Sequence, residues 1–261
     1  MKFTKMQGLG NDYLYIYGEV PLNVSELAVK YSDRHFGVGS DGLIFIAPSK
    51  VADFKMRIFN ADGSEAKMCG NGIRCVGKFV YDKGYTDKTE LKIETLSGIK
   101  TLILKIVFGK VKTVSVDMGE VSVAKDITLT AADSEFTVTP VSVGNPHIVT
   151  FLNGVENFPV EKYGEILEKH EKFPDGVNVE FAEITDYGIR MRVWERGSGV
   201  TLACGTGACA VVSAAVKKGL INAGEFITVK LDGGNLQVKY TGENAYMQGG
   251  AEFVCEGETY D

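Results

Sequence analysis

The chain has 261 residues, of which 44% are apolar, so it can bury the core of one large domain or of two smaller ones. Its formal net charge of −6, with Lys and Arg scattered among more numerous acidic residues, argues against nucleic acid as a partner and favours a small molecule or a protein. No stretch approaches the roughly 20 apolar residues of a membrane helix, and no signal peptide is recognisable, so we expect no membrane association and a cytoplasmic location. Five cysteines, an odd number, argue for reduced thiols over a disulfide framework.

Short runs in which apolar and polar residues alternate predict half-buried, mostly antiparallel strands separated by Gly, Asn and Asp turns. The clearest of these runs are, in chain order, LKIETL (91–96), TVSVDM (113–118), FTVTPVSV (136–143), RMRVW (190–194) and FITVKL (226–231).

Four segments have helical periodicity. Two are amphipathic and are predicted to lie on the outside, at 25–37 and 160–173. The other two directly follow a cysteine, at about 70–83 and 205–218, and each ends before a glycine, Gly84 or Gly219. The last of the four is apolar on nearly every side, which predicts a buried central helix.

The chain repeats itself. The sequence around Cys69-Gly-Asn-Gly matches that around Cys204-Gly-Thr-Gly at an offset of 135 residues, as do the strands that precede them. Further matches occur in the same order: Gly10-Asn11 with Gly144-Asn145 and Asp41-Gly42 with Asp175-Gly176 at an offset of 134, and the hairpins that begin at Ile93 and Val229 at 136. Ordered matches with so little drift indicate an internal duplication.

These features predict an α/β fold of the α+β type, with two pseudo-symmetric domains that each wrap a curved, mostly antiparallel sheet around a central helix. We place the first domain at residues 1–115 plus 249–261 and the second at 116–248, with the junction near 111–133. The final segment, GGAEFVCEGETYD, is expected to return to the first domain as a strand.

The two repeated cysteines suggest the chemistry. Free backbone N–H groups and the positive end of the helix dipole favour an anion at a helix N-terminus, so a thiol there is shifted toward the thiolate. The same N–H groups can hold a substrate carboxylate, and glycines allow a close approach of the ligand, which accounts for a helix cost of about 1 kcal/mol for each glycine. Each motif therefore predicts an anion cradle beside a thiol.

If a pseudo-two-fold axis turns both helix N-termini toward one cleft, Cys69 and Cys204 lie on opposite faces of one substrate carbon. One thiol can then remove a proton and the other can return one, which inverts the stereocentre. Orientation can contribute about 7–11 kcal/mol to such a step, and general acid–base transfer about 10²–10⁴-fold in rate.

Other interpretations of the cysteines stay open. Cys75, Cys209 and Cys255 are expected to be small buried hydrophobic residues. A metal site formed by the first two of these with Cys69 and Cys204 would need spacings of C-x5-C and C-x4-C, unlike the usual zinc pattern. We therefore predict no metal site.

A Cys-His-Asn hydrolase is a further alternative, because His147 and several asparagines are present. It leaves the second Cys-Gly-x-Gly motif unexplained.

Six motifs in order resemble the diaminopimelate epimerase family, whose members interconvert LL- and meso-diaminopimelate without a cofactor. The motifs are GLGNDY (8–13), RHFGVGSDGL (34–43), RIFNADGSEAKMCGNG (57–72), VGNPHIV (143–149), DGVNVEF (175–181) and VWERGSG followed by ACGTGACA (193–210). The resemblance covers nearly the whole chain. It implies an isomerase of lysine and cell-wall precursor biosynthesis, with Cys69 and Cys204 as the acid/base pair.

The resemblance also implies roles for further residues. The backbone amides of the reacting-carboxylate cradle are assigned to Gly70, Asn71, Gly205 and Thr206. The residues that bind the amino groups and the far end of the substrate are Asn11, Asn60, Asn145, Asn178, Glu195 and Arg196. An arginine suits a distal carboxylate, and a glutamate suits an ammonium group. His147, together with Glu195, is implied to tune the thiols, although a core histidine with satisfied hydrogen bonds remains an alternative.

One position departs from the family pattern. Some members carry a substrate-contacting glutamine where this chain has Gly42, which offers no side chain.

Two other functions remain open: a proline or hydroxyproline racemase, and a non-catalytic amino-acid-binding protein. No motif for pyridoxal phosphate or another cofactor is present, and the expected partner is a small amino acid. The sequence leaves the choice between a monomer and a homodimer open.

Overall fold

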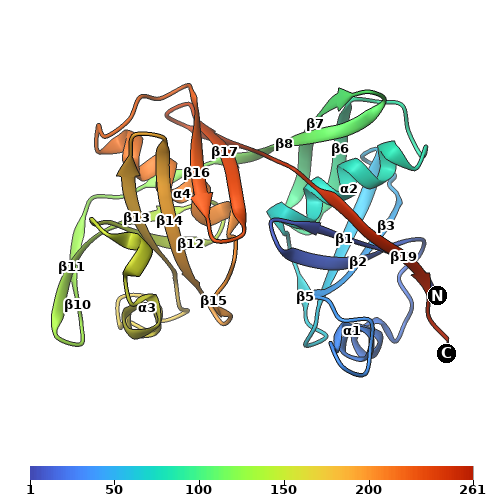
Figure 1. Ribbon diagram of the computed structural model, residues 1–261, viewed down its shortest axis with the longest axis horizontal. Helices are drawn as coiled ribbons and strands as arrows, with labels where there is room; N and C mark the ends of the chain where they lie inside the picture. The colour runs from blue at the N-terminus through green and yellow to red at the C-terminus, as the bar shows by residue number, and fades with distance from the viewer. Residues whose placement is uncertain (261) are drawn as a thin grey trace. The chain divides into compact units, whose positions relative to one another are not determined.

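The computed structural model describes residues 1–260 and divides into two compact units (Figure 1). The first unit comprises Met1–Val116 and the segment from Gly249 onward, and the second comprises Asp117–Gln248. Strands dominate both units, and each unit has two α-helices. This is the mixed α+β class that the sequence predicts. Among the described residues, no helix is long and apolar enough to cross a membrane.

The first unit contains two helices, α1 (Val24–Ser32) and α2 (Gly70–Asp82). Its strands are β1 (Lys2–Gly8), β2 (Asn11–Tyr17), β3 (Gly42–Pro48), β4 (Phe54–Asn60), β5 (Glu65–Ala66), β6 (Glu90–Thr95), β7 (Gly98–Val107), β19 (Glu252–Glu258) and β8 (Lys110–Glu120), which continues into the second unit.

The second unit contains α3 (Val160–Glu168), α4 (Gly205–Lys217) and a short 3₁₀ helix, η1 (Val155–Asn157). Its strands are β9 (Ser122–Val123), β10 (Ile127–Ala131), β11 (Ser134–Ser142), β12 (Pro146–Phe151), β13 (Asn178–Thr185), β14 (Gly188–Glu195), β15 (Gly199–Val200), β16 (Phe226–Leu231), β17 (Gly234–Tyr240) and β18 (Asn244–Gly249).

The strand pairing of the first unit is repeated in the second, which confirms the duplication. In the first unit β2 is parallel to β3 and β4 to β6, whereas β3 with β4 and β6 with β7 are antiparallel. In the second unit β12 with β13 and β14 with β16 are parallel, and β13 with β14 and β16 with β17 are antiparallel. The sheets are thus more mixed than the alternating pattern alone indicates, because a helix between two strands allows them to run in the same direction.

The register corrects one detail of the internal alignment. Gly42 pairs with Asn60 in the first unit, and Val179 pairs with Trp194 in the second. With Asn60 equivalent to Glu195, the position equivalent to Gly42 is therefore Asn178, and not Gly176 as the Asp-Gly match suggests. The second unit has two additional residues before this strand, and a two-residue Asp-Gly match carries too little information to reveal them.

The central helices begin at the predicted residues, and each ends one residue before its predicted end, at Asp82 and at Lys217. Both follow a cysteine N-cap, and each is followed by a glycine with positive φ, Gly84 at 78° and Gly219 at 70°. Nearly all residues of α4 are buried, and α2 buries a continuous run from Asn71 to Val80. Figure 1 shows strands around each of these helices within its own unit. Burial by the surrounding sheet thus stabilises glycine-rich helices that are weak by propensity.

The outer helices α1 and α3 are confirmed with different bounds: α1 begins at Val24, one residue before the predicted segment, α3 begins at the predicted Val160, and both end five residues earlier than predicted. Each packs its apolar residues into a core on one side of its unit, which for α1 includes Val24 and Ala28 and for α3 includes Val160 and Leu167.

The end of the chain forms β19, which pairs antiparallel with β1 from Lys2 opposite Glu258 to Gln7 opposite Glu252. The predicted return of the final segment to the first unit is therefore confirmed. One associated prediction is wrong, because Cys255 is exposed on β19 and is not a buried hydrophobic residue. All residues from Glu252 to Glu256 are exposed, so neither face of this part of β19 is buried, and an apolar residue in a short run does not by itself show that its strand is covered.

Candidate active site

Two equivalent half-sites lie at the N-termini of α2 and α4. Cys69 and Cys204 are the N-cap residues, both in extended backbone conformation. The Sγ of Cys69 accepts a hydrogen bond from the amide of Gly72 at 3.3 Å, and the Sγ of Cys204 accepts one from Gly207 at 3.4 Å. Both sulfurs therefore occupy the position of an N-cap side-chain oxygen, directed at the free amides of the helix.

The glycines two positions into each helix are required by packing. An added Cβ at Gly72 would lie 2.8 Å from Cδ1 of Ile44, and one at Gly207 would lie 2.7 Å from Oε1 of Glu180. Close approach of a ligand is one reason for glycine at these positions. The structure adds a second reason, because a strand side chain fills the space under each helix N-terminus.

In the first half-site, Asn11 lies beside the thiol. The Sγ of Cys69 donates a hydrogen bond to Oδ1 of Asn11 at 3.2 Å, and Nδ2 of Asn11 donates to Oδ2 of Asp41 at 2.7 Å. Asn11 follows a tight turn in which Leu9 and Gly10 have positive φ, at 58° and 84°. This turn places Asn11 at the start of β2, and Asp41 holds the direction of its carboxamide.

Two more of the predicted residues lie in the first unit. Asn60 ends β4, where its Nδ2 donates to Oγ of Ser64 at 3.1 Å and its Oδ1 accepts a 3.5 Å contact from the Tyr13 hydroxyl. Asn71 is buried at the start of α2, and its Oδ1 accepts a hydrogen bond from Nη1 of the buried Arg74 at 3.0 Å. The side chain of Asn71 therefore helps to hold the first turn of α2.

The position of Gly42 explains why a side chain is absent there. A Cβ on this backbone would lie 2.1 Å from the carbonyl oxygen of Phe59. A glutamine would need a different local backbone, so the departure from the family pattern is built into this strand pair.

In the second half-site, His147 is fully buried and has a partner at each ring nitrogen. Its Nδ1 lies 2.7 Å from Oε1 of Glu180, and its Nε2 lies 3.0 Å from Oδ1 of Asn145. Nδ2 of Asn145 donates to Oγ1 of Thr206 at 3.4 Å, and this oxygen lies 3.5 Å from Sγ of Cys204. Both ring nitrogens of the buried His147 therefore have hydrogen-bond partners. A chain of contacts through Asn145 and Thr206 also connects His147 to the thiol of Cys204.

Glu195 lies at the end of β14, close to Cys204. Burial raises its pKa above the ordinary value of a glutamate, and hydrogen bonds from Thr201 and Cys204 oppose this shift. A partly buried carboxyl with an elevated pKa beside a thiol is a typical feature of a site where protons move.

The surroundings of Cys204 change the expectation for its charge. The helix N-terminus favours the thiolate, but burial, followed by the negative charges of Glu195 and Glu180, raises the pKa of Cys204 well above its ordinary value. Hydrogen bonds from Thr206 and from the amide of Gly207 act in the opposite direction and are weaker. The expectation from the helix terminus is thus wrong for Cys204 in this structure, which favours the protonated thiol.

The remaining predicted residues are Asn178 and Arg196. Both polar atoms of Asn178 bond to the backbone, since Nδ2 donates to the oxygen of Pro146 at 2.9 Å and Oδ1 accepts from the amide of Arg196 at 3.0 Å. The exposed Arg196 donates from Nη1 to the carbonyl oxygen of Asp175 at 3.1 Å. Asn178 therefore connects β12 to the segment that carries Arg196.

The inner cysteines are structural. Cys75 and Cys209 lie inside α2 and α4 with no exposed surface, as predicted. Burial raises the pKa of Cys75 to about 11, so this thiol stays protonated at physiological pH.

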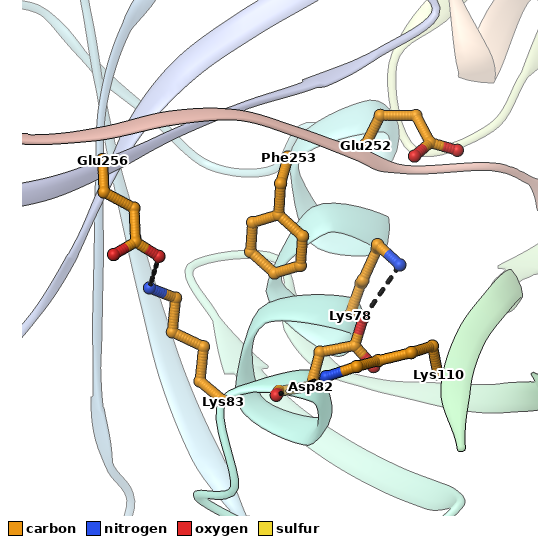
Figure 2. Close-up of a pocket in the computed structure, with 7 residues that line it drawn as sticks. All are labelled: Lys78, Asp82, Lys83, Lys110, Glu252, Phe253 and Glu256. Carbon is orange, nitrogen blue, oxygen red and sulfur yellow. Dashed lines mark hydrogen bonds and ion pairs between the residues drawn. The ribbon is translucent and has the colours of Figure 1, made fainter. Parts of the chain in front are cut away.

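A cavity elsewhere in the first unit is lined mainly by paired charges (Figure 2). It has a volume of about 420 Å³ and lies at the opposite end of α2 from Cys69. In Figure 2 the Lys78 ammonium points to Asp82 at 2.9 Å, and Lys83 pairs with Glu256.

Sequence reasoning missed three polar residues of the half-sites: Asp41, Glu180 and Thr201. Each is a single acid or hydroxyl whose partners are distant in sequence or lie across a turn. A signal was available for Glu180, because it is an acidic residue within the apolar run of a buried strand.

A family model described as "Diaminopimelate epimerase" matches residues 3–124 and 139–254. Among curated relatives, the diaminopimelate epimerase of Methanococcus maripaludis strain C5 is 54% identical, and the comparison covers 99% of each chain. The diaminopimelate epimerase of Acetivibrio thermocellus is 52% identical, covering 99% of this chain and 98% of the relative.

Solved structures share the fold at much lower identity. A phenazine biosynthesis protein from Bacillus anthracis has a TM-score of 0.80 at 16% identity, covering 100% of this chain and 98% of that one. A hydroxyproline epimerase from Agrobacterium vitis has a TM-score of 0.75 at 16% identity, covering 98% and 91%. The full-length matches to curated relatives, together with the two cysteine-capped helices, place this chain in the diaminopimelate epimerase family, whose members are isomerases.

Proposed function

We propose that the protein interconverts LL- and meso-diaminopimelate by a two-thiol acid/base mechanism without pyridoxal phosphate or metal. The observation that carries the proposal is the equivalence of Cys69 and Cys204, each the N-cap of a central helix with its sulfur on a helix amide. In this proposal residues 1–115 plus 249–261 form one catalytic domain and residues 116–248 form the other.

The reacting carboxylate is bound by backbone amides at both helix N-termini. Gly70 and Asn71 supply them in one half, and Gly205 and Thr206 supply them in the other. These groups point along the helix dipoles and remain fixed during the reaction, so they stabilise the negative charge that develops on the carboxylate as the enediolate forms.

The reaction removes one proton from the substrate and returns one to it. One thiolate removes the α-proton and becomes a thiol, the electron pair moves into the carboxylate, and the other thiol donates its proton to the opposite face of the carbon. The product has inverted configuration, and the two sulfurs have exchanged protonation states. The raised pKa of Cys204 supports this thiol as the proton donor. Cys69, which donates a hydrogen bond to Oδ1 of Asn11 in this structure, must lose its proton and this hydrogen bond before it acts as the base.

The rest of the substrate is bound by polar side chains from both halves. Arg196 is the partner proposed for the distal carboxylate, and Glu195 is proposed for an ammonium group. The asparagines that complete the substrate contacts in this proposal are Asn11, Asn60, Asn145 and Asn178. His147 is proposed to tune Cys204 together with Glu195, which the chain of contacts through Asn145 and Thr206 supports.

A proline or hydroxyproline racemase is the second candidate, favoured by the fold shared with the hydroxyproline epimerase. Such a substrate has one carboxylate and needs no distal arginine, so the exposed Arg196 beside the half-site favours the longer substrate with two head groups.

The protein is proposed to act on its free amino-acid substrate in the cytoplasm, independently of nucleic acid and membrane, and a homodimer is compatible with this role.

The test measures α-hydrogen exchange and inversion in deuterated water. Purified protein with LL-diaminopimelate should yield meso-diaminopimelate that carries deuterium at the inverted α-carbon. Turnover of L-proline or hydroxyproline in place of diaminopimelate would establish the second candidate. Binding of diaminopimelate without any exchange would show a binding protein that lacks the chemistry.

A further inference from the structure

The two halves hold equivalent asparagines in opposite directions. Asn11 and Asn145 occupy equivalent positions: each follows a glycine with positive φ, Gly10 at 84° and Gly144 at 88°, and Asn11 begins β2 whereas Asn145 immediately precedes β12. In the first half, Asp41 accepts from Nδ2 of Asn11, so the carbonyl oxygen of Asn11 faces the Cys69 thiol at 3.2 Å. In the second half, the carbonyl oxygen of Asn145 faces His147, and its NH2 group is directed to Thr206 beside Cys204. The carboxamides thus present an acceptor to one thiol and a donor toward the other.

The direction of Asn145 depends on His147. Because Oδ1 of an amide can only accept, Nε2 of His147 must carry a hydrogen and donate it. The other ring nitrogen, Nδ1, then bonds to Oε1 of Glu180 at 2.7 Å, either as donor to a carboxylate or as acceptor from a carboxylic acid. In both cases Glu180 fixes the orientation of the ring and keeps the hydrogen of Nε2 on the side of Asn145.

The fold itself does not need a carboxyl group at residue 180. The register makes Ile44 the equivalent residue in the first half, and Ile44 fills the space under Gly72 just as Glu180 fills the space under Gly207. Glu180 has no exposed surface, and its Oε2 has no hydrogen-bond partner within residues 1–260. A buried carboxyl with one unpaired oxygen is costly, so its presence where an isoleucine serves the same packing indicates a functional role.

We propose that Glu180 is a positioning residue for the reaction, which acts through His147 to hold the carboxamide of Asn145 with its NH2 group toward the N-terminus of α4. The inference rests on the proposed function, because it assigns Asn145 a donor role toward the substrate. Glu180 itself lies behind His147 and touches no reacting atom.

The test compares Glu180→Leu with Glu180→Gln. Leucine fills the space, as Ile44 does in the other half, but leaves Nδ1 of His147 without a partner, so the ring no longer has a fixed direction. Glutamine donates its amide hydrogen to Nδ1 and keeps the hydrogen bond from Nε2 to Asn145. We expect Glu180→Leu to lower kcat/KM for diaminopimelate about tenfold or more, and Glu180→Gln to stay within about threefold of wild type.

Phe181→Leu is the matched control. Phe181 is the neighbour of Glu180 on β13, and it is buried in the core of the other sheet face with Phe136 and Phe158. This variant should lower Tm at least as much as Glu180→Leu, because it removes part of a buried ring, and its kcat/KM should remain near that of wild type. An equal loss of kcat/KM in Phe181→Leu would show that Glu180→Leu acts only by loosening the domain and would overturn the inference.

A double-mutant cycle with Asn145→Ala tests the route of the effect. If Glu180 acts through Asn145, Glu180→Leu should change kcat/KM less than about twofold in the Asn145→Ala background. Full additivity of the two losses would overturn the inference while the proposed function stands. A wild-type protein that turns over no diaminopimelate would instead overturn the proposed function and the inference with it.

Discussion

The Sγ atom of Cys204 lies 3.4 Å from the backbone nitrogen of Gly207, and Glu180 occupies the space directly behind this glycine. The thiol of Cys204 and the carboxyl of Glu180 therefore both lie next to Gly207, which has no side chain to separate them. The same arrangement recurs at Cys69 and Gly72, with Ile44 in place of the glutamate.

Gly207→Ala should therefore damage the half-site. The added Cβ would lie 2.7 Å from Oε1 of Glu180 and 3.3 Å from Sγ of Cys204, so either the helix N-terminus or the carboxyl must move. We expect the free energy of unfolding to fall by about 1–3 kcal/mol. We also expect kcat to fall, because the thiol and the carboxyl are displaced. Denaturant unfolding and steady-state kinetics measure the two effects. Ser213→Ala on the same helix is the control, because the hydroxyl it removes is buried and has no partner within residues 1–260; a similar loss of kcat there would contradict the explanation.

Cys69→Ala and Cys204→Ala should each abolish inversion, because each removes the proton carrier on one face of the substrate carbon. We expect kcat to fall by at least about 10³-fold in both variants, with circular dichroism and Tm close to wild type. A coupled stereospecific assay measures inversion. Near-normal inversion by either variant would show that the two-thiol mechanism is wrong.

Stability should decline at alkaline pH through the buried thiol of Cys75. Burial raises the pKa of Cys75 from 9.0 to about 11, so the native state holds its proton more tightly than the unfolded chain does. Its contribution is fully present below pH 9 and is lost as the pH rises through 11. Two pKa units correspond to about 3 kcal/mol.

Cys75→Ala is the variant that checks this contribution. It should cost about 1–2 kcal/mol at pH 7 through lost packing, with little effect on kcat. It should also flatten the decline of the unfolding free energy between pH 8 and 11, measured by urea titration. An equally steep decline in the variant would assign the alkaline loss to other groups.

Arg196→Ala should raise KM for diaminopimelate about tenfold or more, because the partner proposed for the distal carboxylate is lost. The variant keeps both thiols, so kcat should fall less than kcat/KM. Lysine, which lacks the second carboxylate, should be a poor substrate for wild type and no worse for the variant. Equal effects on both substrates would place Arg196 outside the distal site.

Much of the fold follows from local sequence patterns. The alternation of apolar residues predicts the strands, and the cysteine before and the glycine after each central helix predict its ends. The duplication could be recognised because five short matches keep their order and spacing. The parallel strand pairs could not be predicted with the same certainty, because local alternation does not record the direction of a neighbouring strand.

Some residues of the candidate site could likewise be predicted from local sequence, and others could not. Cys69 and Cys204 could be identified from the sequence because the chemistry of a helix N-terminus is local, and the family motifs identified the asparagines, Glu195 and Arg196. Their partners could not be found in this way. Asp41 is 30 residues from Asn11, and Glu180 is 33 residues from His147. Such contacts depend on strand register, which a single sequence does not fix.

The sequence by itself determined that the chain is a duplicated α+β protein with a cysteine at the start of each central helix, because periodicity, capping and repetition are written in neighbouring residues. The tertiary structure decided how the two half-sites differ: Glu180 and His147 stand behind Cys204, whereas Ile44 and Asp41 stand near Cys69. The physical reason is burial, since the charge and direction of a buried polar group are set by whatever the fold packs against it, and that neighbour is distant in sequence.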